Sequence, residues 1–195
     1  NLAIDLRRFD DFKTVHYSKP LILWNHRWEY DKNPEMFFRC LKYIKEQGYN
    51  FSLVVLGENF SSTPKIFEKA KVTFKENILH WGYVEDLKSY AKWLWKANIL
   101  PVTSNQDFFG VSVMEAIYCE AFPILPYRLS FPELIPKEFH HDYFYKNDND
   151  LNKKLISLIK TYKNRDSKAL KKVALKFDWN NLAPLYDTKM DSLIK

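Results

Sequence analysis

Five short apolar runs, separated by segments with helical periodicity, set the tightest limit on what this chain can fold into. The runs span residues 21–24, 51–56, 77–81, 98–102 and 123–125. Each is continuous rather than alternating, which is typical of parallel strands covered on both faces. Regular alternation of such strands with helices predicts an α/β fold, in which right-handed crossovers join the strands of an open parallel sheet.

The predicted helices have recognisable ends. Pro34 suits the first turn of a helix, and Gly48 is a natural stop for that helix. Residues 85–86 are both acidic and favour the start of another helix, which we expect to continue to about residue 96. The last third shows two apolar stripes at helical spacing, and Asp178 is expected to cap a final helix.

Domain organisation follows from length and from the absence of linkers and repeats. We expect residues 20–195 to form one domain with a helical C-terminal tail, preceded by a connecting segment of residues 1–19. The net charge of +6 comes entirely from residues 146–195, which hold 12 basic and 6 acidic side chains. Such a region is usually a solvated helical face, and the alternative is a surface for nucleic acid or an anionic partner.

Several classes of protein are disfavoured by what the chain lacks. Cys40 and Cys119 have no metal-binding or redox spacing, so we expect reduced core residues and a cytoplasmic setting. No apolar run approaches the roughly 18 residues that a membrane span needs, and no signal peptide is visible. Because the chain begins with Asn1 rather than Met, we expect a fragment. No dinucleotide or P-loop fingerprint is present, and we expect no metal site, with residues 140–142 in an exposed loop.

The most informative functional segment is the one that contains Asp107, Gly110 and Glu115. It follows the fourth apolar run, and we expect a loop and then a helix whose first turn carries Glu115. A helix start favours anions, because its free N–H groups and its dipole attract negative charge. Acidic side chains beside such a site must contact something other than phosphate, and sugar hydroxyls are the obvious candidates. The segment therefore indicates a nucleotide sugar as ligand.

Two cations follow the first apolar run. Arg27 offers a planar fork and Lys32 a point charge, and both suit a pyrophosphate. The alternative is that they form surface salt bridges with Glu29 or Asp31.

Glycines follow the second and third apolar runs. Gly57, and Gly82 before Tyr83 and Val84, permit close approach of the backbone to a ligand. A tight turn is the alternative explanation at both places.

Three segments together resemble one family. Residues 24–34, with the sequence WNHRWEYDKNP, resemble the signature of the tRNA-queuosine mannosyltransferases, which are retaining GT-B glycosyltransferases of the glycogen-synthase-like type. Residues 108–119 are similar to the same family, and residues 5–9 resemble the connector that leads out of its N-terminal domain. The resemblance extends over residues 3–160. Asp107 stands where the Glu-x7-Glu pattern of these enzymes has Glu, and its side chain is one methylene shorter.

The resemblance implies a fold, a reaction and a set of site residues. The chain would be the Rossmann-like C-terminal half of a GT-B enzyme, with the acceptor domain outside this sequence. The family transfers mannose from GDP-mannose to queuosine in tRNA, retains the anomeric configuration and needs no metal or other cofactor. Arg27 and Lys32 would hold the pyrophosphate, Glu115 the ribose and Asp107 the donor sugar. The remaining residues expected to contact the donor are Gly57, Tyr83, Val84, Phe109, Gly110 and Val111.

Two other functions stay open from the sequence. One is a related transferase that uses another donor, such as UDP-glucose, on a glycan or lipid. The other is a non-catalytic module that binds nucleotide sugars, which the shortened side chain of Asp107 favours.

Overall fold

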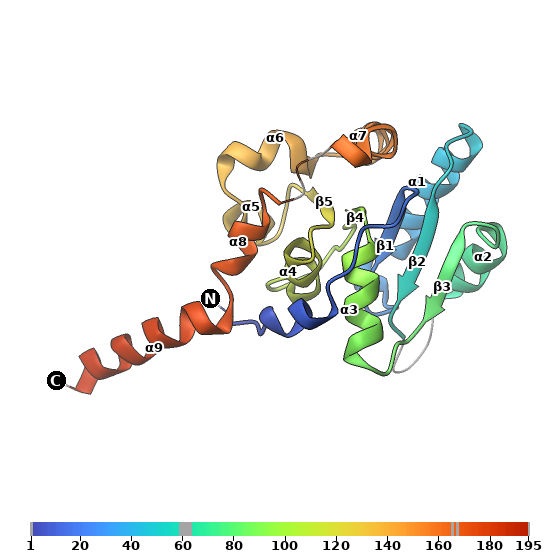
Figure 1. The fold of residues 1–195 in the computed structure, drawn as a ribbon. Helices are drawn as coiled ribbons and strands as arrows, with labels where there is room; N and C mark the ends of the chain where they lie inside the picture. The colour runs from blue at the N-terminus through green and yellow to red at the C-terminus, as the bar shows by residue number, and fades with distance from the viewer. Residues whose placement is uncertain (1, 59–63, 165, 167, 195) are drawn as a thin grey trace.

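The computed structural model describes residues 2–58, 64–164, 166 and 168–194, and these form a three-layer α/β fold (Figure 1). Within this part, a parallel six-stranded sheet has the strand order β3-β2-β1-β4-β5-β6. The strands are β1 (Leu21–Trp24), β2 (Ser52–Leu56), β3 (Ile78–Gly82), β4 (Ile99–Pro101), β5 (Phe122–Pro126) and β6 (Phe144–Tyr145). The predicted parallel sheet is confirmed, and the two-residue strand β6 is an addition to it.

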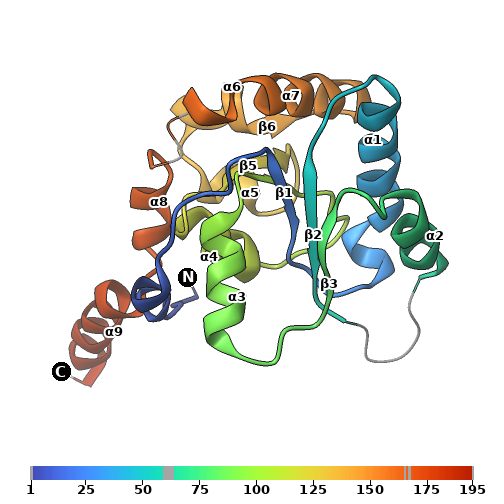
Figure 2. The same cartoon turned by 45° about the vertical axis from the view of Figure 1, so that its right-hand side comes forward.

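Helices cover both faces of the sheet (Figure 2). On one face, α1 (Pro34–Glu46) contacts α2 (Lys65–Thr73) and α7 (Asp148–Thr161). On the other, α4 (Val111–Tyr118) contacts α3 (Leu87–Lys96) and α8 (Lys171–Leu175), and the 3-10 helix η1 (Arg7–Phe12) lies against α3. The other helical segments are η2 (Tyr30–Lys32), α5 (Phe131–Leu134), η3 (Lys137–Phe139), α6 (His140–Tyr143), η4 (Tyr162–Asn164) and α9 (Trp179–Ile194).

The helix ends follow the local chemistry of the sequence. Asn33 caps α1 by accepting a hydrogen bond from the amide three residues later at 3.2 Å, and Pro34 takes the first helical position. Asp86 caps α3 in the same way at 2.7 Å. Asp178 accepts from the amide of Asn180 at 3.1 Å, which confirms the predicted cap of α9.

Continuous apolar runs became strands because both faces of the sheet are covered. Every residue of β1, β2, β4 and β5 is buried, whereas the edge strand β3 is partly exposed. An aromatic cluster extends this core between β1 and the helices α1 and α2. Trp24 packs edge-on against Phe37 with 4.9 Å between ring centroids, and Trp28 stacks on Phe67 at 4.5 Å. Both tryptophans therefore anchor the loop that follows β1.

The N-terminal segment is part of the packed fold. Leu6 and Phe9 are fully buried, and the Phe9 carbonyl accepts a hydrogen bond from the indole of Trp95 at 2.8 Å. Ile4 forms a parallel bridge with Asp178 at the start of α9. The first residues and the base of α9 consequently lie side by side in both views (Figures 1 and 2).

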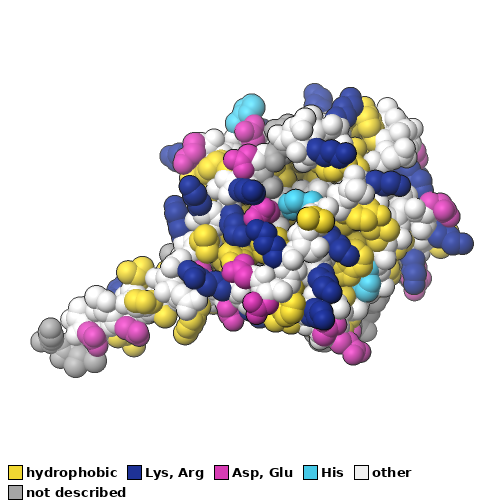
Figure 3. Space-filling model, in the orientation of Figure 1, with side chains coloured by type: hydrophobic (Ala, Val, Ile, Leu, Met, Phe, Trp, Pro, Cys, Tyr) yellow, Lys and Arg dark blue, Asp and Glu magenta, His cyan; other side chains and the backbone are white. Residues whose placement is uncertain are grey.

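Helix α9 projects away from the rest of the molecule (Figure 1). Exposed apolar residues along it are Trp179, Leu185, Met190 and Leu193. Figure 3 shows hydrophobic and acidic side chains on this helix, whereas Lys and Arg side chains are spread over the body of the same face.

Two local expectations were wrong. Helix α4 begins at Val111, so Glu115 lies in its second turn rather than its first. His140 and His141 lie in the short helix α6 rather than in a loop. No cluster of three or more His, Cys, Asp or Glu side chains that could bind a metal occurs in the described ranges.

Two further sequence expectations concern the cysteines and membrane-spanning helices. Cys40 and Cys119 are buried and free, and burial raises the pKa of the Cys40 thiol to about 12. None of the helices that the structure describes has both the length and the apolar character needed to cross a bilayer.

Candidate functional site

A cavity of about 930 Å³ lies beyond the carboxyl ends of β1 and β4. These two strands are neighbours at the point where the strand order reverses, which is where open α/β sheets place their ligands. The loop after β1 and the segment from residue 106 into α4 form most of its wall. The residues that line the cavity are Leu2, Asn25, His26, Arg27, Glu29, Tyr30, Asp31, Lys32, Gln106, Asp107, Phe108, Phe109, Gly110, Val111, Ser112 and Glu115.

The sequence-predicted residues divide into two groups. Those that line the cavity together are Arg27, Lys32, Asp107, Phe109, Gly110, Val111 and Glu115. Gly57, Tyr83 and Val84 are outside its lining. Gly57 has a φ of +101°, and a Cβ there would lie 2.4 Å from the backbone oxygen of His26. Close packing of two loops therefore accounts for the glycine at position 57 without a ligand.

The two cations behave differently. Arg27 pairs with Glu29 at 3.1 Å, and more than half of its side chain is exposed. Such a surface pair contributes little, about 0–1 kcal/mol, and leaves the guanidinium free to turn toward a ligand. Lys32 is nearly buried, and its Nζ contacts carboxylates of Asp31 at 3.1 Å and Asp107 at 3.4 Å. The salt bridges left open as an alternative therefore exist, and Lys32 also joins the two walls of the cavity.

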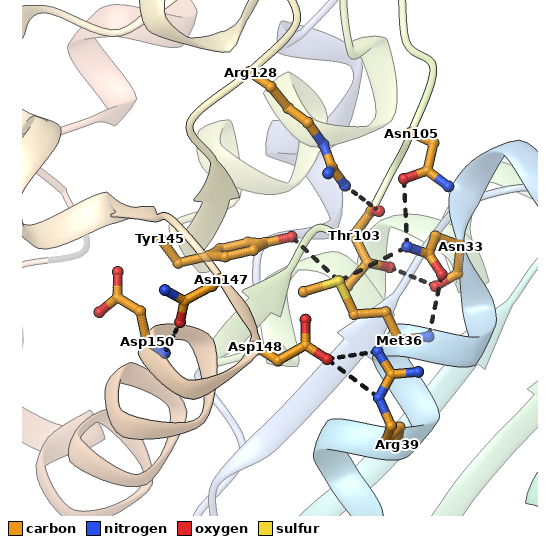
Figure 4. A network of polar contacts seen from close by, with 10 residues as sticks. All are labelled: Asn33, Met36, Arg39, Thr103, Asn105, Arg128, Tyr145, Asn147, Asp148 and Asp150. Carbon is orange, nitrogen blue, oxygen red and sulfur yellow. Dashed lines mark hydrogen bonds and ion pairs between the residues drawn. The ribbon is translucent and has the colours of Figure 1, made fainter.

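A hydrogen-bond network fixes the loop after β4 against the start of α1 (Figure 4). The buried Thr103 donates from its hydroxyl to the carbonyls of Lys32 and Asn33 at 2.9 and 3.0 Å. Arg128 donates to the Thr103 carbonyl at 3.0 Å, and Asn33 donates to Asn105 at 3.4 Å. Both walls of the cavity are thereby held in one arrangement. Sequence reasoning missed Thr103 and Arg128, because an isolated polar residue carries no sign of a distant partner.

The N-terminus of α4 faces the cavity. Its first-turn amides have no helical acceptor, and Gly110, Val111 and Ser112 line the cavity there. Gly110 has a φ of +79°, and a Cβ there would approach the ring of Phe131 to 2.8 Å. The glycine lets the chain turn into the helix where a larger residue would clash.

Glu115 is buried and bonded at both oxygens. Its exposed fraction is 5%, and it accepts hydrogen bonds from Arg8 at 2.7 Å and from the hydroxyl of Tyr90 at 2.8 Å. Burial raises the pKa of Glu115, while the Tyr90 hydrogen bond and the Arg8 charge oppose that rise. Sequence reasoning missed Tyr90 and treated Arg8 only as part of the connector, since both lie far from Glu115 along the chain.

Three further polar atoms, which belong to residues that line the cavity, have no protein partner in the part of the chain that the structure describes. They are Asn25 Oδ1, His26 Nε2 and Asp31 Oδ1, and all three are buried. Buried polar atoms in native proteins almost always have a partner, so these three atoms are exceptions, and each is covered by protein rather than open to the cavity. Asn25 and His26 were missed as site residues, because nothing in their spacing separates them from the other polar residues of the loop around Arg27.

Comparisons with known proteins agree with this geometry. The family model described as "Glycosyl transferases group 1" matches residues 7–174. A Drosophila melanogaster protein named tRNA-queuosine alpha-mannosyltransferase is 33% identical over 147 residues, which are 75% of this chain and 36% of that protein. A probable sucrose-phosphate synthase of Thermosipho melanesiensis is 22% identical over 91% of this chain and 42% of its own. The chain thus spans less than half the length of both relatives.

Solved structures confirm the fold. A glycosyltransferase from Rickettsia africae superimposes with a TM-score of 0.78 at 14% identity, covering 100% of this chain and 56% of its own. Anabaena HepE, solved in complex with UDP, gives 0.76 at 12% identity, covering 97% and 56%. The expected Rossmann-like sheet of a GT-B C-terminal half is therefore confirmed.

Proposed function

The chain belongs to the glycosyl transferases group 1 family, and from that premise we propose that it is the donor-binding half of a retaining hexosyltransferase. The donor is GDP-mannose and the acceptor is queuosine in tRNA. The 33% identity with the Drosophila protein named for that reaction supports this choice. So does the block of residues 24–34, from which Arg27 and Lys32 line the cavity.

One observation carries the proposal: cations from the loop after β1 and acids around α4 meet in a single cavity at the switch point of the sheet. A diphosphate fits between the α4 N-terminus and the cations Arg27 and Lys32. Glu115 and Asp107 then accept hydrogen bonds from hydroxyls of the ribose and of the transferred sugar. The ligand must carry both phosphate and hydroxyl groups, and a nucleotide sugar carries both.

The residues would act mainly through charge and position. When the bond from the anomeric carbon to the diphosphate breaks, negative charge develops on the departing oxygen. Arg27, Lys32 and the free amides at the start of α4 are in place before the reaction begins, so they stabilise that charge as it develops. No step in this scheme needs a metal ion. Phe109, Gly110 and Val111 would contribute backbone groups to the sugar and phosphate.

The acceptor side would come from outside this chain. In this proposal residues 1–19 connect the donor half to an N-terminal acceptor domain, and the short coverage of both curated relatives leaves room for one. The cation excess of residues 146–195 would assist docking of tRNA through phosphate contacts. Activity in the cytoplasm completes the proposal.

A UDP-sugar transferase is the second candidate, because the Anabaena neighbour was solved with UDP. Calorimetric titration of GDP, UDP and ADP into the protein separates the candidates. Tighter binding of GDP than of UDP supports the proposal, and a clear preference for UDP supports the second candidate. If none of the three nucleotides binds, both are wrong. Mannosyl transfer to queuosine-containing tRNA by the protein with its acceptor half then tests the reaction itself.

A further inference from the structure

Both oxygens of the Glu115 carboxylate are held by side chains that lie behind the wall of the cavity. Arg8, on the 3-10 helix η1, donates from its guanidinium to Oε1 at 2.7 Å, and Tyr90, on α3, donates from its hydroxyl to Oε2 at 2.8 Å. Glu115 lines the cavity, whereas Arg8 and Tyr90 are outside its lining. An ionised carboxylate accepts about four hydrogen bonds, so acceptor positions remain for a ligand after both protein bonds are made.

Helix η1 is anchored to the two helices that meet at this carboxylate (Figure 1). The ring of Phe9 is fully buried, and its centroid lies 6.1 Å from that of Tyr90 on α3. Asp10 accepts hydrogen bonds from the hydroxyl of Tyr118 on α4 at 2.7 and 2.8 Å. The guanidinium of Arg8 lies over the Phe9 ring at 4.9 Å from its centroid. Arg8 therefore reaches α4 from a segment that is itself fixed on two sides.

The charge of Arg8 matters because Glu115 is buried. Burial raises the pKa of Glu115, and the hydrogen bond from Tyr90 and the charge of Arg8 oppose that rise. Burial also raises the pKa of Tyr90 well above its ordinary value, so Tyr90 stays neutral and supplies a donor without a charge. Among the described residues, Arg8 is the only cation in a salt bridge with Glu115. Without it, a buried carboxylate would lose its counter-ion and one of its two fixed bonds.

We propose that Arg8 is a positioning residue of the donor site, which holds the carboxylate of Glu115 in the orientation that binds the ribose hydroxyls. This inference rests on the proposed function, in which Glu115 contacts the ribose. Arg8 acts through Glu115, because it lies outside the cavity lining. Donor affinity then depends on the docking of η1, a segment far from the cavity loops in the sequence.

The test compares GDP with its dideoxy analogue, which lacks both ribose hydroxyls. Dissociation constants are measured by calorimetry on the wild-type chain, Arg8→Met and Arg8→Lys. Arg8→Met keeps an unbranched side chain without charge, and we expect GDP to bind about three- to tenfold more weakly while the analogue changes by less than about twofold. Arg8→Lys keeps a cation that can reach the carboxylate and should recover part of that loss.

Two controls separate positioning from a general structural defect. Arg7→Met removes the neighbouring cation of η1, which pairs instead with Asp178 at 3.4 Å, and it should leave the affinity for both ligands unchanged. The second control repeats Arg8→Met in the Glu115→Gln protein. Because Arg8 acts through the carboxylate, its loss should weaken GDP binding no further there, whereas a structural defect would weaken it by the same factor in both backgrounds.

Each outcome distinguishes the inference from the proposed function. Failure of the wild type to bind GDP rejects the proposed function. Normal GDP binding by Arg8→Met, equal weakening of both ligands, or an equal loss in the Glu115→Gln background rejects the inference while the proposed function stands. A loss of GDP affinity in Arg7→Met as large as that in Arg8→Met also rejects it. If Arg8→Met does not fold, Arg8→Gln, which keeps a hydrogen-bond donor without the charge, replaces it under the same criteria.

Discussion

Replacing Glu115 with glutamine should separate binding from folding. The substitution keeps the size of the side chain and its hydrogen bond with the Tyr90 hydroxyl, but it removes the charge that faces Arg8. Burial already disfavours the charged form of Glu115, because its pKa is raised. The substitution removes the ion pair with Arg8, whose side chain is partly exposed. This loss is offset because burying a neutral amide costs less free energy than burying a carboxylate. We expect the free energy of unfolding to change by about 1 kcal/mol or less.

Binding should respond much more strongly than stability. A hydrogen bond from a ribose hydroxyl to a carboxylate contributes about 1.5–3 kcal/mol, which corresponds to roughly a ten- to hundredfold change in Kd. Calorimetry with GDP at pH 7.5 measures that change, and urea unfolding of both proteins measures stability. Unchanged GDP affinity in a folded Glu115→Gln protein would refute the assignment of Glu115 to the ligand. A large loss of stability would refute the argument about burial.

Three other perturbations give distinct signatures. Gly57→Ala should lower the free energy of unfolding, measured in urea, by about 2–4 kcal/mol, because its Cβ would clash with the His26 carbonyl. Gly48 also has a positive φ but has no neighbour within contact distance among the described residues, so Gly48→Ala should lower that free energy by only about 1–2 kcal/mol. His26 has a lowered pKa in the folded state, so below about pH 6.5 the unfolded chain binds a proton on this ring before the folded chain does, and about 3 kcal/mol of stability should be lost as the pH falls toward 4. Urea unfolding between those pH values should show that loss in the wild type and not in His26→Phe. Lys32→Met leaves Asp107 without its cation, and GDP binding should weaken by about tenfold or more in calorimetry; equal binding would exclude Lys32 from the diphosphate.

The sheet could be predicted from sequence because burial on both faces leaves a direct trace. The runs that became β1, β2, β4 and β5 are apolar at nearly every position, and all of their residues are buried. The caps at Asn33 and Asp178 were predictable for a similar reason, since each acts on an amide two or three residues away. Strand β6 was missed because two residues are too few to show a pattern.

The site was only partly predictable, because its contacts are long-range. Arg27, Lys32, Asp107 and Glu115 could be placed in one cavity, since loops at the carboxyl ends of parallel strands converge. Arg8 reaches Glu115 across 107 positions of sequence, and no local pattern announces such a contact. Gly57 was left between two explanations, a ligand and a tight turn, and its close approach to the His26 carbonyl accounts for it without a ligand. A glycine required by a neighbouring loop and one required by a ligand look the same in a sequence.

The bonds that Thr103 makes with the carbonyls of Lys32 and Asn33 also bear on how a ligand enters. These bonds fix both walls of the cavity when the protein folds. Ligand binding therefore does not have to order a flexible loop, and it loses little conformational entropy. A substitution at Arg128 should therefore weaken the affinity for the ligand, although its guanidinium donates only to the backbone carbonyls of Ser104 and Thr103 in the loop after β4.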